Sequence, residues 1–266
     1  ITTYNDADLT NTYSDIGSYT VEITGDFPNL SFTTNANGDF VTAVLATPVG
    51  HDNSVTNFFR AFYGSNNLTS VSADLDLSKV TSLIQAFRDC PFTSFPNLDY
   101  SATTTTASAW YGCGGLTTFP ASGFPVATSI SQAWRKCFGL TSFGLITIPN
   151  VTNAKSAWES CTSLITAPSI DFGSVINLDE TWRDCTSLTT FPANVFDNTA
   201  CIIFNNAFYN CALTATSVNN ILISIDAAGR SGGTLGIWGG TSAAPTGAGA
   251  TAKANLITKG WTVTTN

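Results

Sequence analysis

The chain has 266 residues, 43% of them hydrophobic and 11% charged, and a formal net charge of −8 at pH 7. The apolar fraction allows a sizeable core, while the charged fraction is less than half of the roughly 25% usual in soluble proteins. Ten basic residues against 18 acidic ones argue against a nucleic-acid partner, which needs a basic face, and no apolar run reaches the ~20 residues of a membrane-inserted helix.

The first part of the chain, residues 1–50, is predicted to be a β-rich module. Residues 1–59 contain seven Asp or Glu and no Lys or Arg, a composition break that indicates a separate unit. Within it, residues 18–32 alternate apolar and polar side chains as half-buried strands do. They resemble the last strands of a polycystic-kidney-disease-type β-sandwich, which would make the chain a truncated or processed product. A β cap over the first coil of the next unit is compatible with the same pattern.

The central part, residues 51–215, contains an internal repeat. Six segments align on the pattern Ala-(Phe/Trp)-x-x-Cys-x-x-Leu, often continued to Phe-Pro, and a degenerate seventh starts at Ala207. The Leu column, which has Phe92 in its second place, advances in five steps of 24 residues from Leu68 to Leu188. A repeat of this length cannot bury its apolar side alone and stacks on its neighbours. We therefore predict a right-handed solenoid of seven coils, with one short parallel strand each. The Leu column and the following Phe column should point inward. A third column should fill the opposite wall: Phe62, Phe87, Trp110, Trp134, Trp158, Trp182 and Phe208.

These repeats resemble the BspA-type leucine-rich repeat family, in its variant with a (Phe/Trp)-x-x-Cys-x-x-Leu core. The resemblance implies a leucine-rich-repeat-like fold. Because that family occurs on bacterial surfaces and in bacteriophage virion proteins, where it mostly serves attachment, the resemblance also implies an adhesive role.

The last part, residues 216–266, leaves the period and is predicted to be an α/β C-terminal cap. One amphipathic helix should run over Ser217–Gly229 with Ser217 as its N-cap, and a second should end at Gly260 after starting near Gly249. Strands should follow each helix, at residues 234–240 and 261–266. The final segment, from Thr241 to Asn266, resembles the ends of phage and prophage structural proteins, which favours a virion.

The cysteines form one column of the repeat, with Cys201 apart from it. Zinc sites pair cysteines two to four residues apart, and no such pair occurs. Stacked coils bring neighbouring Cα atoms within disulfide range, but a column of parallel side chains does not aim its sulfurs at one another. We expect small, buried, reduced side chains at Cys90, Cys113, Cys137, Cys161, Cys185 and Cys211.

Residues that could carry chemistry do not converge in the sequence. His51 is the single histidine and no Gly-x-Ser-x-Gly elbow precedes it, so a Ser/His/Asp site is not favoured. The acidic pairs Asp74/Asp76 and Asp179/Glu180 could suggest a glycosidase, but each lies in a polar loop between coils. Asn5, Asp6 and Asp8 offer oxygen ligands for calcium without a complete ligand loop. We predict a protein that is not an enzyme and has no cofactor and no metal.

Two features of the repeat could form a binding surface. The residue after each aromatic is predicted to face outward along the whole rod. Tyr and Arg are enriched where interfaces concentrate their energy. The alternative, which the pattern favours slightly, is that these long side chains only cover an apolar wall. On the strand side, rows of Ser and Thr beginning at Thr69 and Ser70 could contact sugars or ice, or only supply β-propensity. The tentative binding column is Tyr63, Arg88, Tyr111, Arg135, Glu159, Arg183 and Tyr209.

Together these observations predict a non-enzymatic surface protein of a phage virion. Its partners would be a host receptor, protein or glycan, or other virion proteins, and a homo-oligomer is possible. A decoration or fibre protein of capsid or tail without receptor recognition, and a bacterial cell-surface adhesin, are the alternatives.

Overall fold

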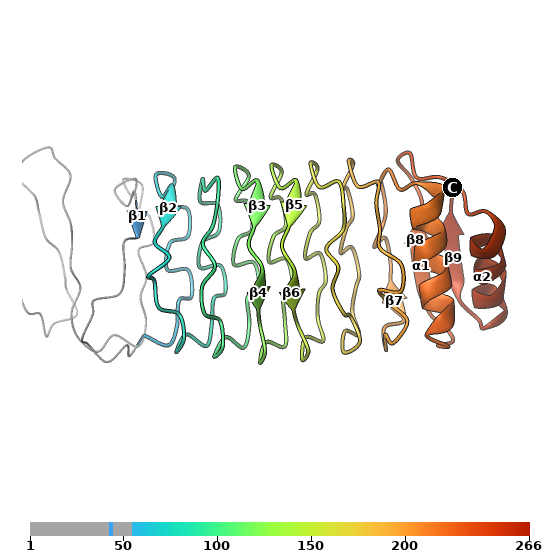
Figure 1. The fold of residues 1–266 in the computed structure, drawn as a ribbon, viewed down its shortest axis with the longest axis horizontal. Helices are drawn as coiled ribbons and strands as arrows, with labels where there is room; N and C mark the ends of the chain where they lie inside the picture. Colours follow the sequence, from blue (N-terminus) through green and yellow to red (C-terminus); the bar gives the residue numbers. More distant parts are fainter. Residues whose placement is uncertain (1–42, 45–54) are drawn as a thin grey trace, which may run out of the picture.

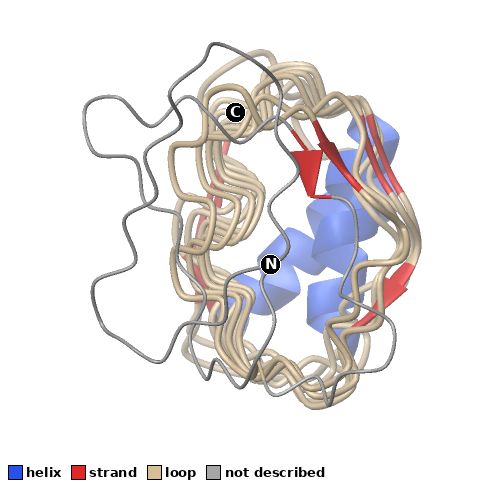
Figure 2. Ribbon diagram, turned by 90° about the vertical axis from the view of Figure 1, so that its left-hand side faces the viewer, coloured by secondary structure: helices blue, strands red, loops and turns tan. Residues whose placement is uncertain are grey.

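The computed structural model describes residues 43–44 and 55–266, and in this part the chain winds into a row of stacked coils (Figure 1). Each coil runs down the wall nearer the viewer, here called the front wall, and up the opposite wall, here called the back wall. Because the chain advances from left to right at the same time, the winding is right-handed (Figure 1). Figure 2 shows the coils end on, with the two walls facing one another.

The front wall is built from very short parallel strands. They are β1 (Ala43–Val44), β2 (Ser70–Val71), β3 (Thr118–Phe119), β4 (Ser122–Gly123), β5 (Ser142–Phe143) and β6 (Ile146–Thr147). β1 pairs with β2, β3 with β5 and β4 with β6, all in parallel. Thr118 lies opposite Ser142 and Ser122 opposite Ile146, so the register between these coils is one period of the sequence repeat.

The back wall is held by a second ladder, which starts at a row of single parallel bridges. In each coil every other backbone N–H donates to the next coil: the amides of Gln132, Trp134 and Lys136 donate to carbonyls one coil on, at 2.8–2.9 Å. The amides between them close local turns. This alternation requires left-handed residues, and Gln132 and Lys136 have φ of +57° and +62°. The bridged row is Asn57, Ser82, Thr105, Ser129, Asn153 and Asn177.

Side chains of the bridged row explain why it contains only Asn, Ser and Thr. Each side-chain oxygen accepts the backbone N–H two residues further on, for example Asn153 Oδ1 from Lys155 at 3.0 Å and Ser129 Oγ from Ser131 at 3.2 Å. These side-chain turns satisfy an amide at the point where the chain enters the back wall.

The core is a continuous column of stacked rings. Trp110, Trp134, Trp158 and Trp182 are fully buried, their ring centroids are 5.4–5.8 Å apart, and their planes differ by no more than 9°. Phenylalanines of the front wall meet these rings edge-on; Phe143, for example, lies 4.8 Å from Trp134. The leucines of the Leu column are fully buried as well: Leu68, Leu116, Leu140, Leu164 and Leu188.

The cysteine column joins neighbouring coils. All seven cysteines are buried and free. Each thiol of the column donates to the carbonyl of the aromatic residue in the preceding coil, as Cys161 does to Trp134 at 3.1 Å and Cys185 to Trp158 at 3.0 Å. A small donor is therefore placed where the repeat has an inward-facing carbonyl.

The C-terminal unit continues both walls with longer elements. α1 (Ala215–Ala227) and α2 (Gly247–Thr258) follow the front wall, whereas β7 (Ile203–Phe204), β8 (Thr234–Ile237) and β9 (Thr262–Thr265) form a parallel sheet on the back wall (Figures 1 and 2). This sheet extends the bridged row. The amide of Leu178, which follows Asn177, donates to the Ile203 carbonyl at 3.0 Å, and Ile203 lies opposite Thr234 and Thr234 opposite Thr262.

The predicted start of the first helix is wrong. The N-cap of α1 is Thr214, whose side chain accepts the amide of Ser217. Ser217 lies inside the helix and is buried, because its hydroxyl accepts the Phe191 N–H at 2.9 Å and donates to the Thr189 carbonyl at 2.8 Å. The second helix begins at Gly247, after Thr246.

The predicted strands at residues 18–32, the candidate His51 and the candidate calcium ligands Asn5, Asp6 and Asp8 lie outside the described residues. Within the segment assigned to the N-terminal module, β1 pairs with β2, so one rung of the stack precedes the boundary expected at residue 51.

Candidate functional surfaces

The Tyr/Arg column occupies the back wall, one residue after each buried ring. Its members from Tyr63 to Arg135 are half-buried. The Arg88 guanidinium lies 5.4 Å from the ring centroid of Tyr63 and 4.1 Å from that of Tyr111. The Arg135 guanidinium lies 5.7 Å from the centroid of Tyr111. Cation and ring thus alternate along the row, an arrangement that is attractive at each step.

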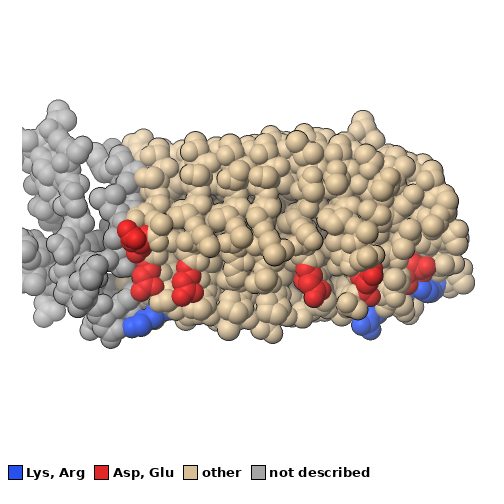
Figure 3. All heavy atoms as spheres, in the orientation of Figure 1, with Lys and Arg blue, Asp and Glu red and all other residues tan. Residues whose placement is uncertain are grey.

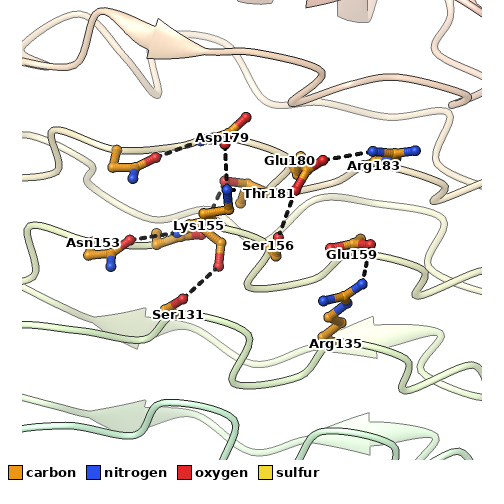
Figure 4. Close-up of polar contacts among 12 residues, drawn as sticks. Ser131, Arg135, Asn153, Lys155, Ser156, Glu159, Asp179, Glu180, Thr181 and Arg183 are labelled. Atoms are coloured by element: carbon orange, nitrogen blue, oxygen red, sulfur yellow. Dashed lines mark hydrogen bonds and ion pairs between the residues drawn. The ribbon is translucent and has the colours of Figure 1, made fainter.

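Glu159 departs from the predicted outward orientation. Its side chain is only 8% exposed, and its Oε1 accepts an ion pair from Arg135 Nη2 at 2.8 Å (Figure 4). The expectation that the whole column faces out is therefore wrong at this position. The physical reason is the neighbouring arginine, which compensates the cost of burying the carboxylate.

The next member of the column, Arg183, belongs to an ion-pair network with residues outside the column. Lys155 Nζ contacts Asp179 at 2.7 Å and Glu180 at 3.9 Å, and Arg183 Nη1 contacts Glu180 at 2.7 Å (Figure 4). The hydrogen bond from Lys155 to Asp179 raises the pKa of Lys155, and that from Arg183 to Glu180 raises the pKa of Arg183. The pair Asp179/Glu180, considered as possible catalytic carboxylates, is thus occupied by these two cations.

At the C-terminal end of the column lies an aromatic pair that the repeat pattern did not reveal. The ring of Trp238, 41% exposed, is 4.5 Å from that of Tyr209, and Arg183 lies 5.3 Å from the centroid of Tyr209. Gly239 has φ of +73°, and a Cβ there would be 2.9 Å from the Tyr209 ring. Trp238 belongs to the cap and not to a repeat, so the period could not indicate it.

The front wall has the opposite character. Its exposed rows contain hydroxyl side chains, and the segments 91–98, 114–123, 138–147 and 162–170 contain no charged residue. Figure 3 shows the upper half of this face without charged side chains; the acidic and basic ones lie in its lower half, apart from one acidic group near mid-height at the left-hand end. Thr117 and Thr141 each donate to the carbonyl of the equivalent residue one coil earlier, both at 3.1 Å.

A second threonine row was missed by sequence reading. The hydroxyls of Thr81, Thr104, Thr128 and Thr152 each donate to the carbonyl of the preceding member, beginning with Thr56. All five are exposed. The nearly constant spacing of these threonines along the chain is the signal that could have identified the row.

Two shallow grooves follow β4 and β6 on the front wall and share Thr147. The first is lined by residues including Asn97, Asp99, Ser122 and Gly123. The second is lined by Leu145, Pro149, Ser169, Asp171 and Ser174, among others.

The cysteines offer no reactive thiolate. Burial raises the pKa of Cys90 and Cys211 to about 12 and that of Cys201 to about 11. The pKa values of the four central thiols are raised as well, again by burial. Among the described residues no three His, Cys, Asp or Glu side chains form a group that could hold a metal ion, and no helix there is long and apolar enough to cross a membrane.

Comparisons with known proteins find no match: no family model, no curated protein and no solved structure is significantly similar to this chain.

Proposed function

We propose that this protein is a non-enzymatic attachment protein on the surface of a phage virion, and that its coils are a leucine-rich-repeat-like solenoid of the BspA type. The support for the fold is the parallel register of one repeat period between coils together with the buried Leu column. The family resemblance of the repeats and of the C-terminal end supports the virion surface.

The observation that carries the attachment role is the preorganised back wall. Arg88 is held between two tyrosine rings and Arg183 between Glu180 and Tyr209, yet their side chains remain 25% and 36% exposed. Side chains that are already ordered lose little conformational entropy when a partner binds. Tyr, Trp and Arg are also the residues that most often dominate binding energy. A host receptor or another virion protein would dock on this wall.

The test is adsorption of the phage that carries the protein, in competition with the purified chain. The chain should inhibit adsorption, and Arg88→Ala should raise the half-inhibitory concentration about tenfold, the effect of ~1.4 kcal/mol. Arg230→Ala is the matched control, because this exposed arginine lies in the cap and its side chain bonds only the Thr199 carbonyl among the described residues. Antibodies should label intact particles.

Unlabelled particles would contradict the virion assignment and favour the bacterial adhesin. Labelled particles whose adsorption the chain does not inhibit would favour the decoration or fibre protein. Equal inhibition by Arg88→Ala and Arg230→Ala would remove the back wall as the contact surface.

A further inference from the structure

The front wall contains a trough whose chemistry differs from that of the back wall. The two grooves meet at Thr147, and their polar lining combines hydroxyl, amide and carboxylate groups. We infer that this trough binds a neutral polysaccharide, a chain of sugar units without phosphate, sulfate or carboxylate groups. The inference rests on the proposed function, because it names the chemical class of a receptor for an attachment protein.

The carboxylates of the trough are fixed as hydrogen-bond acceptors. Asp99 Oδ1 accepts the Ser101 N–H at 2.8 Å, and Asp171 Oδ1 accepts the Gly173 N–H at 2.9 Å. These backbone bonds orient each carboxylate while both side chains remain exposed. An ionised carboxylate only accepts hydrogen bonds, so its second oxygen suits a donor such as a sugar hydroxyl.

Apolar and hydroxyl groups supply the rest of a sugar-binding surface. Leu145 is 62% exposed at the edge of the second groove, and Pro125 and Pro149 line the first and the second groove. They offer contact area for the C–H faces of sugar rings. Thr147, at the centre, can both donate and accept. A binding site of this mixed kind fixes the orientation of its ligand with a few polar groups on an apolar surface.

Charge selects a neutral ligand over an anionic one. No Lys or Arg lines either groove, whereas Asp99 and Asp171 do. The whole chain has a net charge of −8, and its cations are mostly on the back wall or in the cap. A phosphate, sulfate or carboxylate polymer would meet like charge along the trough and is disfavoured.

Periodicity selects a polymer over a single sugar. Asp99, Gly123, Thr147 and Asp171 follow one another at steps of one repeat period, and the pair Gly123↔Thr147 is in parallel register. Equivalent positions therefore recur at the spacing of parallel strands, ~4.8 Å. A ligand whose own units repeat can engage several of these positions at once, which strengthens weak individual contacts.

The experiment is affinity electrophoresis of the full chain in gels that contain dextran, mannan or galactan, with dextran sulfate and heparin as anionic arms. At least one neutral polymer should retard the chain, and the anionic ones should not. Gly123→Gln should weaken the retardation at least tenfold. This residue has ordinary φ, and a Cβ there meets only Thr147 Oγ1, at 3.2 Å, so the new side chain fills the groove without straining the backbone.

The matched control is Gly114→Gln, at a glycine of ordinary φ whose added Cβ would be 3.4 Å from Phe138 and which lines neither groove. Its retardation should equal that of the unchanged chain. The inference would be overturned if none of the three neutral polymers retarded the chain, or if dextran sulfate or heparin retarded it equally well. It would also be overturned if the two glutamine variants were retarded equally.

The adsorption assay separates this inference from the proposed function. If the unchanged chain and Gly123→Gln inhibit adsorption equally well, attachment stands and the trough is not its site. If neither inhibits adsorption but Gly123→Gln alone loses retardation in the gels, the sugar site stands and the attachment role does not.

Discussion

Truncation of one ring in the middle of the aromatic column should destabilise several coils. Trp134 is fully buried, stacks on Trp110 at 5.5 Å and Trp158 at 5.4 Å, and meets Phe119 and Phe143 edge-on at 5.0 and 4.8 Å. Phe or Trp to Ala changes in cores typically cost ~3–5 kcal/mol. Each aromatic contact adds ~0.5–1.5 kcal/mol beyond area burial, so we expect Trp134→Ala to cost at least ~5 kcal/mol.

Trp134→Phe is the matched control, because the same column contains Phe87 and Phe208. The indole N–H of Trp134 is buried without a hydrogen-bond partner among the described residues. Its removal recovers part of the ~1–3 kcal/mol that an unpaired buried donor costs, and we therefore expect Trp134→Phe to lose about 1 kcal/mol or less.

Both variants are measured by urea unfolding and by hydrogen exchange of the backbone amides. In a stack, each coil is stabilised by its neighbours, so exchange in Trp134→Ala should rise in the coils of Trp110 and Trp158 as well. An equal loss of stability in the two variants would refute the stacking argument. Unchanged protection of the adjacent coils would refute the coupling between coils.

Three further predictions follow from named contacts. Arg135→Leu should lower the free energy of unfolding in urea by ~3 kcal/mol, because it leaves the Glu159 carboxylate buried and unpaired. The double variant Arg135→Leu with Glu159→Leu should recover most of that loss, and equal stability of the single and double variants would contradict this. Ser217→Ala should cost ~1–3 kcal/mol by leaving the buried Phe191 amide without an acceptor, more than the ~1 kcal/mol of the N-cap change Thr214→Ala. The reverse order would show that the cap matters more than the buried bridge. Burial raises the thiol pKa in the folded chain, from 9.0 to about 12 at Cys90, so the unfolded chain loses its thiol protons at lower pH than the folded chain. The free energy of unfolding should therefore fall as the pH rises above the thiol pKa of the unfolded chain, by ~1.4 kcal/mol per pH unit for each such thiol. A free energy of unfolding that stays constant with pH above this value, measured by denaturant titration, would contradict the prediction.

The sequence predicts which residues occupy equivalent positions in successive coils better than it predicts how the backbones of those coils pair. The constant repeat step indicates which residues share a column, and the structure pairs Thr118 with Ser142. The same step could not show that the back wall has its own ladder, because that ladder depends on left-handed residues such as Gln132 and Lys136. Left-handed conformations are expected for Gly, Asn and Asp. The column of Gln132 contains one such residue, Asn206, and so does not display them, whereas the column of Lys136 could have indicated them, because it includes Gly64, Asp89, Gly112, Asp184 and Asn210.

The outward column shows a related limit. Its residue types indicated exposure, but burial at Glu159 depends on which residue stands one coil earlier. Arg135 is that residue, and its contact with Glu159 joins two successive coils. The exposure of a side chain in a stack therefore depends on the residues of the coils on either side of it and not only on its own type. The cap prediction failed for the same reason: Ser217 has the composition of an N-cap, but Phe191 and Thr189 of the preceding coil occupy its hydroxyl.

The two walls differ because the chain uses different means to join its coils on each of them. On the back wall, backbone amides and thiols hold neighbouring coils together from inside, and the exposed side chains form a second, ionic and aromatic layer. On the front wall, threonine hydroxyls bridge the coils beside the backbone pairing of the short strands, and the only charged residues that line the trough are the carboxylates Asp99 and Asp171. A trough without cations and a wall of cations and aromatic rings on the same rod can recognise partners of different chemistry. Arg88→Ala should therefore weaken the inhibition of adsorption and leave retardation by the neutral polysaccharides unchanged, whereas Gly123→Gln should reduce that retardation, so the two single variants distinguish the back wall from the trough.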